Sequence, residues 1–409
     1  MVAGSSFNIW KSLRGLPRGV WILAAATLVN RVGTMVLPFL VLYLTRELGW
    51  SAARAGIALG VYGVGSIIAA PLAGKLSDRI GPMPIMQGSL IAGGVLLLLY
   101  PLVDSFAAVI ALTLVWAIVT ESFRPANMAC VADLVTPEQR KPAYALLRLA
   151  INLGMSVGPA AAGFIAARSF GWIFIADAVS TLAAGFVLIM LPITAMHCET
   201  PDETSQQSRA ASSRRLLILE DKRFALFLSA IFLTGVVFFQ HEGALPLFLV
   251  DDLHFSPAFY GLLFTVNTVM IVFMEVPLNA ATAHWEHRRG LALGAALFAL
   301  GSGMFAIAEA PVAIIAGIVV WTVGEMLLFP QAAAYVSDIA PQARRGEYMG
   351  IYALSFNVAF AIGPWAGTAA LAAYGARAMW IGVFLVGIIA AVLMARVSVT
   401  QTTAATAPA

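Results

Sequence analysis

Charged side chains are scarce in this chain of 409 residues. Only 11% of the residues are Asp, Glu, Lys or Arg, whereas 60% are hydrophobic and the mean hydropathy is +0.88. Because a soluble domain carries about 25% charged residues, this composition excludes a soluble globular protein. The small net charge of +3 does not indicate a nucleic-acid partner. We therefore expect the lipid bilayer to be the main surroundings of the chain.

Cysteine is nearly absent, and so are the patterns that bind nucleotides or metals. The two cysteines, Cys130 and Cys198, fall on the expected cytoplasmic side, so no disulfide is predicted. No glycine-rich loop is followed by Lys and Ser or Thr, so direct use of ATP is not supported. His284 and His287 have the spacing of metal ligands but no further ligand cluster nearby. Since no Ser/His/Asp or Cys/His arrangement indicates catalysis, we predict neither an enzyme nor a cofactor.

Long apolar runs are abundant instead. Each run has about 20 residues, enough to cross a bilayer as a helix, and backbone groups in lipid must be paired within the segment. The runs cover approximately residues 20–44, 55–73, 83–102, 106–130, 143–166, 171–194, 224–249, 257–279, 290–309, 312–336, 348–373 and 376–396. The sequence therefore predicts an all-α integral membrane protein with 12 transmembrane helices.

Two stretches about half a chain apart share one pattern of residues. The first begins at Val131 (VADLVTPEQRKPAYALLRLAINLGMSVGPAAAG) and the second at Val336 (VSDIAPQARRGEYMGIYALSFNVAFAIGPWAG). The matching pairs include Asp133/Asp338, Arg140/Arg344, Tyr144/Tyr348, Gly158/Gly363, Pro159/Pro364 and, upstream, Glu121/Glu325 and Pro125/Pro330. Duplicated halves in an apolar chain are typical of transporters with a central site. We expect two pseudo-symmetric six-helix bundles, residues 1–195 and 222–409, joined by a polar cytoplasmic linker at 196–221.

The basic residues predict the orientation of the chain in the membrane. With both termini in the cytoplasm, 17 of the 24 Lys and Arg residues fall on the cytoplasmic side and three, Arg31, Arg124 and Arg148, lie within the helices. Only four fall on the opposite side: Arg46, Arg54, Arg168 and Arg377. Because this distribution obeys the positive-inside rule, we predict a multi-pass, monomeric protein of the bacterial cytoplasmic (inner) membrane with cytoplasmic termini.

The loop after the second run reads GKLSDRIG over residues 74–81 and resembles the signature loop of the major facilitator superfamily. Gly74 is expected to allow a close helix approach, and Gly81 a positive φ at the turn. The resemblance implies that Asp78, next to Arg79, helps to hold the cytoplasmic face shut through a neighbouring helix dipole and basic groups. The chain departs from the family pattern at 82–83, where basic residues are usual. A short hairpin with snorkelling charges is the structural alternative.

The fifth run carries small residues at regular spacing, with Gly154, Gly158 and then Pro159. Small residues let two helices approach closely, and a proline permits a bend because it removes a backbone donor. The stretch resembles the helix-five motif of the drug–proton antiporter branch of the superfamily, where it is associated with export. Its copy at Gly363 and Pro364 weakens the argument for direction, and a general packing seam would contain the same residues.

Ionisable residues inside the runs are candidates for the mechanism, because a charge near the bilayer centre costs at least ~2.5–3.5 kcal/mol on insertion scales. They lie on runs one, four, seven and ten, which line the cavity in the family that the chain resembles. The proton-coupling candidates are Glu325, Glu121, Glu242 and His241. The substrate-binding candidates are Arg31, Asn30, Arg124, Glu325, Gln331 and Phe239.

Each candidate also has a purely structural interpretation. Glu121 and Arg124, three residues apart, could neutralise one another, or Arg31 could be locked to Glu121 across a helix interface. His241 and Glu242 could form a buried pair near the external mouth. The run that contains Glu325 has no basic residue, which favours a neutral, proton-carrying state there. For Asp177 and Glu275, nearer the helix ends, we expect structural roles.

The function that this pattern favours is alternating-access export of small organic or drug-like compounds, coupled to protons. A carrier of zwitterions, such as short peptides or amino-acid derivatives, is the alternative, since the cavity could hold a carboxylate and an amine at opposite sides. A membrane enzyme would need an acidic metal-binding cluster, for which Asp251 and Asp252 are poor evidence. A non-transporting receptor would leave the duplicated charges unexplained. The expected partners are a small-molecule substrate, protons and lipid.

Overall fold

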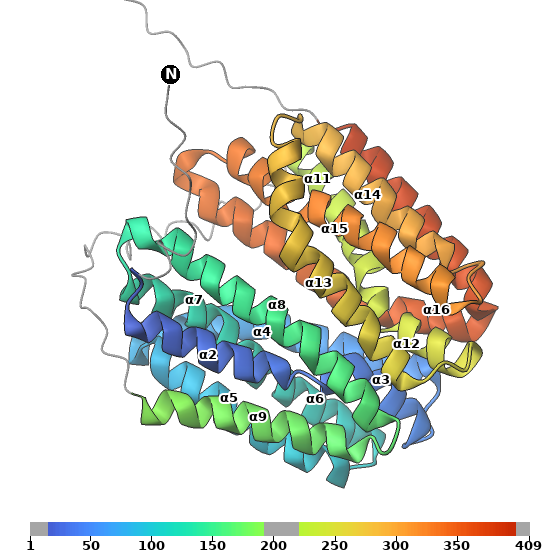
Figure 1. Ribbon diagram of the computed structural model, residues 1–409, viewed down its shortest axis with the longest axis horizontal. Helices are drawn as coiled ribbons and strands as arrows, with labels where there is room; N and C mark the ends of the chain where they lie inside the picture. The colour runs from blue at the N-terminus through green and yellow to red at the C-terminus, as the bar shows by residue number, and fades with distance from the viewer. Residues whose placement is uncertain (1–14, 192–220, 398–409) are drawn as a thin grey trace, which may run out of the picture. The chain divides into compact units, whose positions relative to one another are not determined.

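The computed structural model describes residues 15–191 and 221–397, and this part of the chain is helical almost throughout, with no strand. The first half forms eight α-helices (Figure 1). They are α2 (Arg18–Val32), α3 (Val36–Arg46), α4 (Ala52–Ile80), α5 (Pro82–Leu99), α6 (Phe106–Glu121), α7 (Phe123–Leu134), α8 (Arg140–Ala166) and α9 (Gly171–Met190). Two expected runs are thus interrupted helices: α2 with α3, and α6 with α7.

The second half forms six α-helices within the described residues. They are α11 (Lys222–Phe238), α12 (Ala244–Leu247), α13 (Pro257–Thr282), α14 (His287–Met304), α15 (Pro311–Ile339) and α16 (Arg345–Ala395). Short helical turns at Phe239–His241 and Phe248–Asp252 flank α12. Helix α16 is two helices joined at Gly375, whose φ of 77° is not helical. Glycine tolerates this left-handed φ without strain.

The expected number of spans agrees with these helices. Within the described residues, ten helical segments are long and apolar enough to cross a membrane. Helix α14 adds a further 18-residue helix, and the division of α16 at Gly375 turns its segment into two. Side chains such as Leu102, Ile307 and Val312 are each 77% exposed, as expected of apolar residues that face lipid. The all-α membrane architecture is therefore confirmed.

The helices form two compact units, and each has its own core. Of the described residues, the first unit contains 15–191, 238–273 and 360–379, and the second contains 221–237, 274–359 and 380–397. In the first unit α2 packs on α8, and α5 packs on α9; in the second, α14 packs on α15 (Figure 1). The core of the second unit contains Phe224, Phe227, Tyr335 and Tyr348.

The first unit includes segments from both halves of the sequence. Residues 238–273 and 360–379 pack with the first six predicted spans rather than with the rest of the second half. The division into bundles 1–195 and 222–409 therefore stays a prediction. The expected linker at 196–221 lies, apart from Asp221, outside the described residues.

Candidate functional site: a charged cavity in the first unit

The first transmembrane span is broken in its middle, between Val32 and Val36. Pro38 explains the position of the break, because a proline has no N–H and its ring clashes with the carbonyl group four residues earlier. That carbonyl belongs to Thr34, which lies inside the break. As the third residue of α3, Pro38 stands where a helix needs no intrahelical N–H partner. Arg31 is thereby placed at the end of α2, in the last turn before the break.

A cavity of about 70 Å³ opens beside this break. Because one water needs about 10–15 Å³ of such volume, the cavity is large enough for several. Its walls carry two carboxylates and one guanidinium, together with hydroxyl, amide and aromatic groups. The lining residues are Asn30, Arg31, Thr34, Leu37, Tyr62, Ser89, Leu90, Leu97, Trp116, Thr120, Glu121, Phe123, Asp177 and Thr181. The structure thus brings together three of the predicted site residues: Asn30, Arg31 and Glu121.

Glu121 is held by a tyrosine and not by the arginine three residues away. The Tyr62 hydroxyl donates a hydrogen bond of 2.8 Å to Glu121 Oε1. Helix α6 ends at Glu121 and α7 begins at Phe123, and Arg124 is exposed. In the described part of the chain Glu121 and Arg124 form no ion pair. The structural interpretation in which these two residues neutralise one another is therefore wrong.

Arg31 supplies the positive charge of the cavity. It interacts electrostatically with Asp177 and with the Tyr62 hydroxyl. Its Nε atom is buried and has no hydrogen-bond partner among the described residues. Neither carboxylate of the cavity is within ion-pair distance of its guanidinium in this part of the chain. Arg31 is thus not locked to Glu121 in this part of the chain.

Asp177 is the cavity residue whose importance the sequence argument missed. Its Oδ2 atom accepts hydrogen bonds from the backbone N–H groups of Met35 and Val36, both at 3.0 Å. Its Oδ1 atom accepts one from the Thr181 hydroxyl at 3.2 Å. Asp177 lies seven residues into α9, not near its end, and is the only ionisable residue of that helix. A lone carboxylate in an apolar run was the signal that could have identified it.

His241 and Glu242 lie next to each other at an irregular turn of the first unit. Their side chains approach to 3.5 Å, and His241 Nδ1 lies 2.7 Å from the carbonyl oxygen of Phe238. Glu242 Oε2 is buried without a hydrogen-bond partner among the described residues. Phe239 stacks on Phe360 with 4.5 Å between ring centroids. The pair is therefore buried among aromatic rings, separately from the residues that line the cavity.

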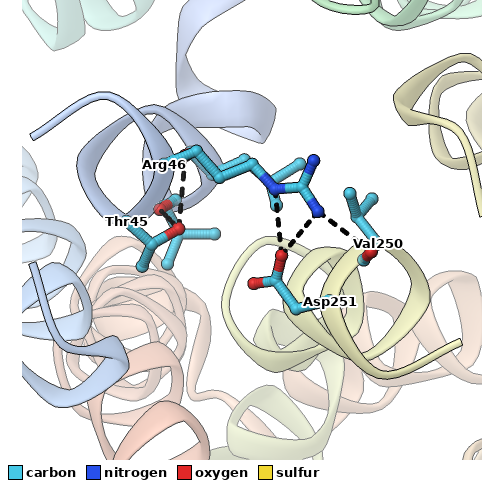
Figure 2. Close-up of polar contacts among 6 residues, drawn as sticks. Thr45, Arg46, Val250 and Asp251 are labelled. Atoms are coloured by element: carbon cyan, nitrogen blue, oxygen red, sulfur yellow. Dashed lines mark hydrogen bonds and ion pairs between the residues drawn. The ribbon is translucent and has the colours of Figure 1, made fainter. Parts of the chain in front are cut away.

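An ion pair joins the two sequence halves inside the first unit. Figure 2 shows Arg46, at the end of α3, with Nε and Nη2 both directed at Asp251 Oδ1, at 2.9 and 2.8 Å. Arg46 Nη2 also donates to the Val250 carbonyl oxygen at 3.0 Å. The orientation predicted from the basic residues puts this pair on the external side. A hydrogen bond also joins the two sequence halves, since the Tyr260 hydroxyl donates to the Pro38 carbonyl oxygen at 3.0 Å.

The loop that resembles the family signature has the turn that its glycine predicts. Gly81 has a φ of 85° and ends α4, with its N–H bonded to the Ser77 carbonyl oxygen at 2.8 Å. Asp78 and Arg79 are exposed. No atom of the first unit lies within 4 Å of a Cβ built at Gly74, so the expected close contact at Gly74 is not found in this unit.

The glycines of the fifth span lie directly against the first span. A Cβ built at Gly158 would stand 2.7 Å from the Val32 carbonyl oxygen, and one at Gly154 would stand 2.9 Å from the Arg31 carbonyl carbon. The packing role expected for these two glycines is therefore present. Their contact fixes the backbone on which Arg31 stands.

Both prolines of the duplicated motif also lie in close contacts. The carbonyl group of Pro159 fills the space where Gly261 lacks a side chain, and Pro364 lies against Gly243. The Gly363 carbonyl accepts a hydrogen bond of 2.8 Å from Gln240 Nε2. All these contacts lie within the first unit.

The second unit contains the two remaining candidates, Glu325 and Gln331, both on α15. Glu325 is partly buried, near the middle of the helix. Gln331 Oε1 lies 3.0 Å from His287 Nδ1, and His287 Nε2 lies 2.9 Å from Asp338 Oδ2. Gln331 is therefore engaged by a histidine at the start of α14. Within the described residues no group of three potential metal ligands occurs.

Ionisable groups inside a bundle of membrane-spanning helices are typical of membrane transporters. The family model of the Major Facilitator Superfamily matches residues 23–251 and 241–408. The chain is thus a transporter that belongs to the Major Facilitator Superfamily.

Relatives along most of the chain are also named as transporters, and none of those below is named as an enzyme. An uncharacterized MFS-type transporter, YqjV of Bacillus subtilis (strain 168), is 25% identical and covers 93% of this chain and 92% of its own. A Na(+), Li(+), K(+)/H(+) antiporter of Planococcus maritimus is 22% identical, with coverages of 81% and 84%. Multidrug resistance protein MdtH of Aeromonas salmonicida (strain A449) is 24% identical, with coverages of 81% and 82%.

A solved structure shows the same fold. The nucleoside transporter NupG has a TM-score of 0.77 at 12% identity, and the alignment covers 92% of this chain and 98% of that one. At this identity the likeness supports the architecture alone.

Proposed function

We propose that this transporter exports small organic or drug-like compounds by alternating access and is driven by protons that enter the cell in exchange. The observation that carries the proposal is the cavity with Arg31 and Glu121 inside a membrane-spanning bundle, since ionisable groups there mark ion or substrate pathways. The names of relatives support it: one is a multidrug resistance protein and another a cation/proton antiporter.

Glu325 is the residue that we propose to carry the coupling proton. It lies near the middle of α15, partly buried, and is the repeat counterpart of Glu121. Its gain and loss of a proton would alternate with the binding of substrate in the transport cycle. Glu121, which accepts a hydrogen bond from Tyr62 and shares a cavity with Arg31, would act as a fixed charge. Glu242 with His241 is the next candidate for the proton.

Substrate contacts are assigned to the part of the predicted set that lies at the cavity. Asn30 and Arg31 both line it. Arg124, which is exposed, and Gln331, which contacts His287, stay predictions. As part of the same proposal, the protein lies in the bacterial inner membrane with both termini in the cytoplasm, and it moves its substrates out of the cell.

The test uses purified protein in sealed liposomes that contain a pH-sensitive dye. Under an imposed proton gradient, ethidium or norfloxacin should move uphill and dissipate the gradient. Glu325→Gln should retain exchange of the compound and lose uphill transport, whereas Glu121→Gln should mainly lower stability. Glu309→Gln, which changes an exposed carboxylate outside the helices of the same unit, is the matched control.

The outcomes separate the proposal from its alternative. Uphill transport that persists in Glu325→Gln would contradict the assignment of the proton to this residue and direct the test to Glu242. Proton flux driven by alanyl-alanine, and by neither ethidium nor norfloxacin, would favour a carrier of zwitterions. Absence of proton flux with all three compounds would count against proton coupling.

A further inference from the structure

The break in the first span leaves backbone donors that must be satisfied inside the membrane. The first N–H groups of a helix have no intrahelical partner, and in lipid each unpaired group is costly. At the start of α3 the donors of Met35 and Val36 both point to Asp177 Oδ2 at 3.0 Å. The Asp177 carboxylate, which belongs to α9, thus caps the N-terminus of α3.

Gly33 allows α9 to approach the break in the first span closely. A Cβ at Gly33 would overlap the Ser180 hydroxyl, so glycine at 33 allows α9 to approach the junction of α2 and α3. The Thr181 hydroxyl donates to Asp177 Oδ1, and Asn30 Nδ2 lies 3.4 Å from Thr181 Oγ1. A chain of contacts therefore runs from the broken backbone through Asp177 back to the last turn of α2.

This cap has no counterpart in the second half. The residue 205 positions after Asp177 is a glycine, Gly382. The part of α16 that follows Gly375 contains no acidic residue. The carboxylate at 177 is therefore not a by-product of the duplication. Its negative charge faces the positive end of α3, which favours an anion, and it faces the charge of Arg31.

We propose that Asp177 is a positioning residue, whose carboxylate holds the first span broken at residues 33–35 and so keeps the Arg31 guanidinium at the cavity that it shares with Glu121. Hydrogen bonds to an ionised acceptor are roughly twice as strong as neutral ones. The charge, and not only the shape, of the side chain is therefore required. The consequence for transport rests on the proposed function, whereas the consequence for the helix break does not.

Hydrogen exchange read by mass spectrometry tests the cap in the full-length protein in nanodiscs. Asp177→Ala should raise deuterium uptake in peptides that cover 33–37 by about two amides, those of Met35 and Val36. Thr113→Val removes a buried hydroxyl of the same unit that does not line the cavity, and it should leave these peptides unchanged. If Asp177→Ala does not fold, Asp177→Asn keeps an acceptor of the same shape and should show a smaller rise. Uptake equal to the wild type in the variant that folds would overturn the proposal.

A double-mutant cycle tests whether Asp177 acts through Arg31. Residues that share one interaction have non-additive effects, whereas independent structural roles add. Asp177→Asn and Arg31→Gln should each lower the thermal midpoint, and the double variant should be more stable than the sum of the two losses predicts. An additive double variant would show that Asp177 does not position Arg31. Neither measurement needs a transported compound, so a failure of the proposed export and a failure of this inference are distinguishable.

Discussion

The contact between Gly158 and the first span makes a quantitative prediction. In Gly158→Ala the new Cβ would stand 2.7 Å from the Val32 carbonyl oxygen and 2.9 Å from that of Arg31. Both are backbone atoms, so α2 and α8 must move apart. Overpacking of this kind costs about 1–3 kcal/mol, against a gain of about 0.5–1 kcal/mol for replacing a glycine inside a helix.

Gly88→Ala is the matched control for this prediction. Gly88 also lies inside a helix of the first unit, but nothing stands within 4 Å of its Cβ position. The control should therefore show the gain alone, and the two variants should differ by the clash, about 1–3 kcal/mol. At about 2–4 °C per kcal/mol this is a difference of about 2–12 °C in thermal midpoint. Midpoints of the purified variants that coincide would refute the tight α2–α8 contact.

Two further predictions concern polar contacts of the first unit. The side chains of the Arg46–Asp251 pair are 41% and 39% exposed, so the pair should stabilise the fold by only about 0–1 kcal/mol. Arg46→Asp and Asp251→Arg should each slightly lower the midpoint of thermal unfolding at low salt, and the double swap should restore it. Tyr62→Phe removes the hydrogen bond to Glu121 and should cost about 1.5–3 kcal/mol. Tyr144→Phe removes a hydroxyl that donates its hydrogen bond at an exposed site, so this variant should change the midpoint less. Equal losses of stability in the two phenylalanine variants would argue against an ionised Glu121.

Features with a local cause could be predicted from the sequence. The apolar runs required helices because lipid offers no hydrogen bonds to an unpaired backbone. Gly81 required a positive φ because a turn follows α4, and Gly154 and Gly158 predicted a close helix contact from their spacing. Each of these expectations depends on residues within one turn or one helix face.

Features that depend on the meeting of distant residues could not be predicted in this way. Glu121 and Arg124 have the spacing of a helical pair, but the helix is interrupted between them, and Tyr62, 59 residues earlier, donates to Glu121 instead. Asp177 caps amides 142 and 141 residues earlier in the chain. Pro38 indicates where the first span must break, but nothing local shows which acceptor satisfies the amides that the break exposes.

The duplicated halves thus provide similar scaffolds with different electrostatics. Glu121 and Glu325 are repeat counterparts, but the first half adds Arg31 and Asp177, and the residue 205 positions after Asp177 is a glycine, Gly382. Glu121 shares its cavity with Arg31, whereas the sequence around Glu325 contains no basic residue on the same helix. Alternating access coupled to protons needs one group that changes its charge and another that does not. In the proposed function the fixed role belongs to Glu121 and the changing role to Glu325, and the difference between the two halves is the reason for that proposal.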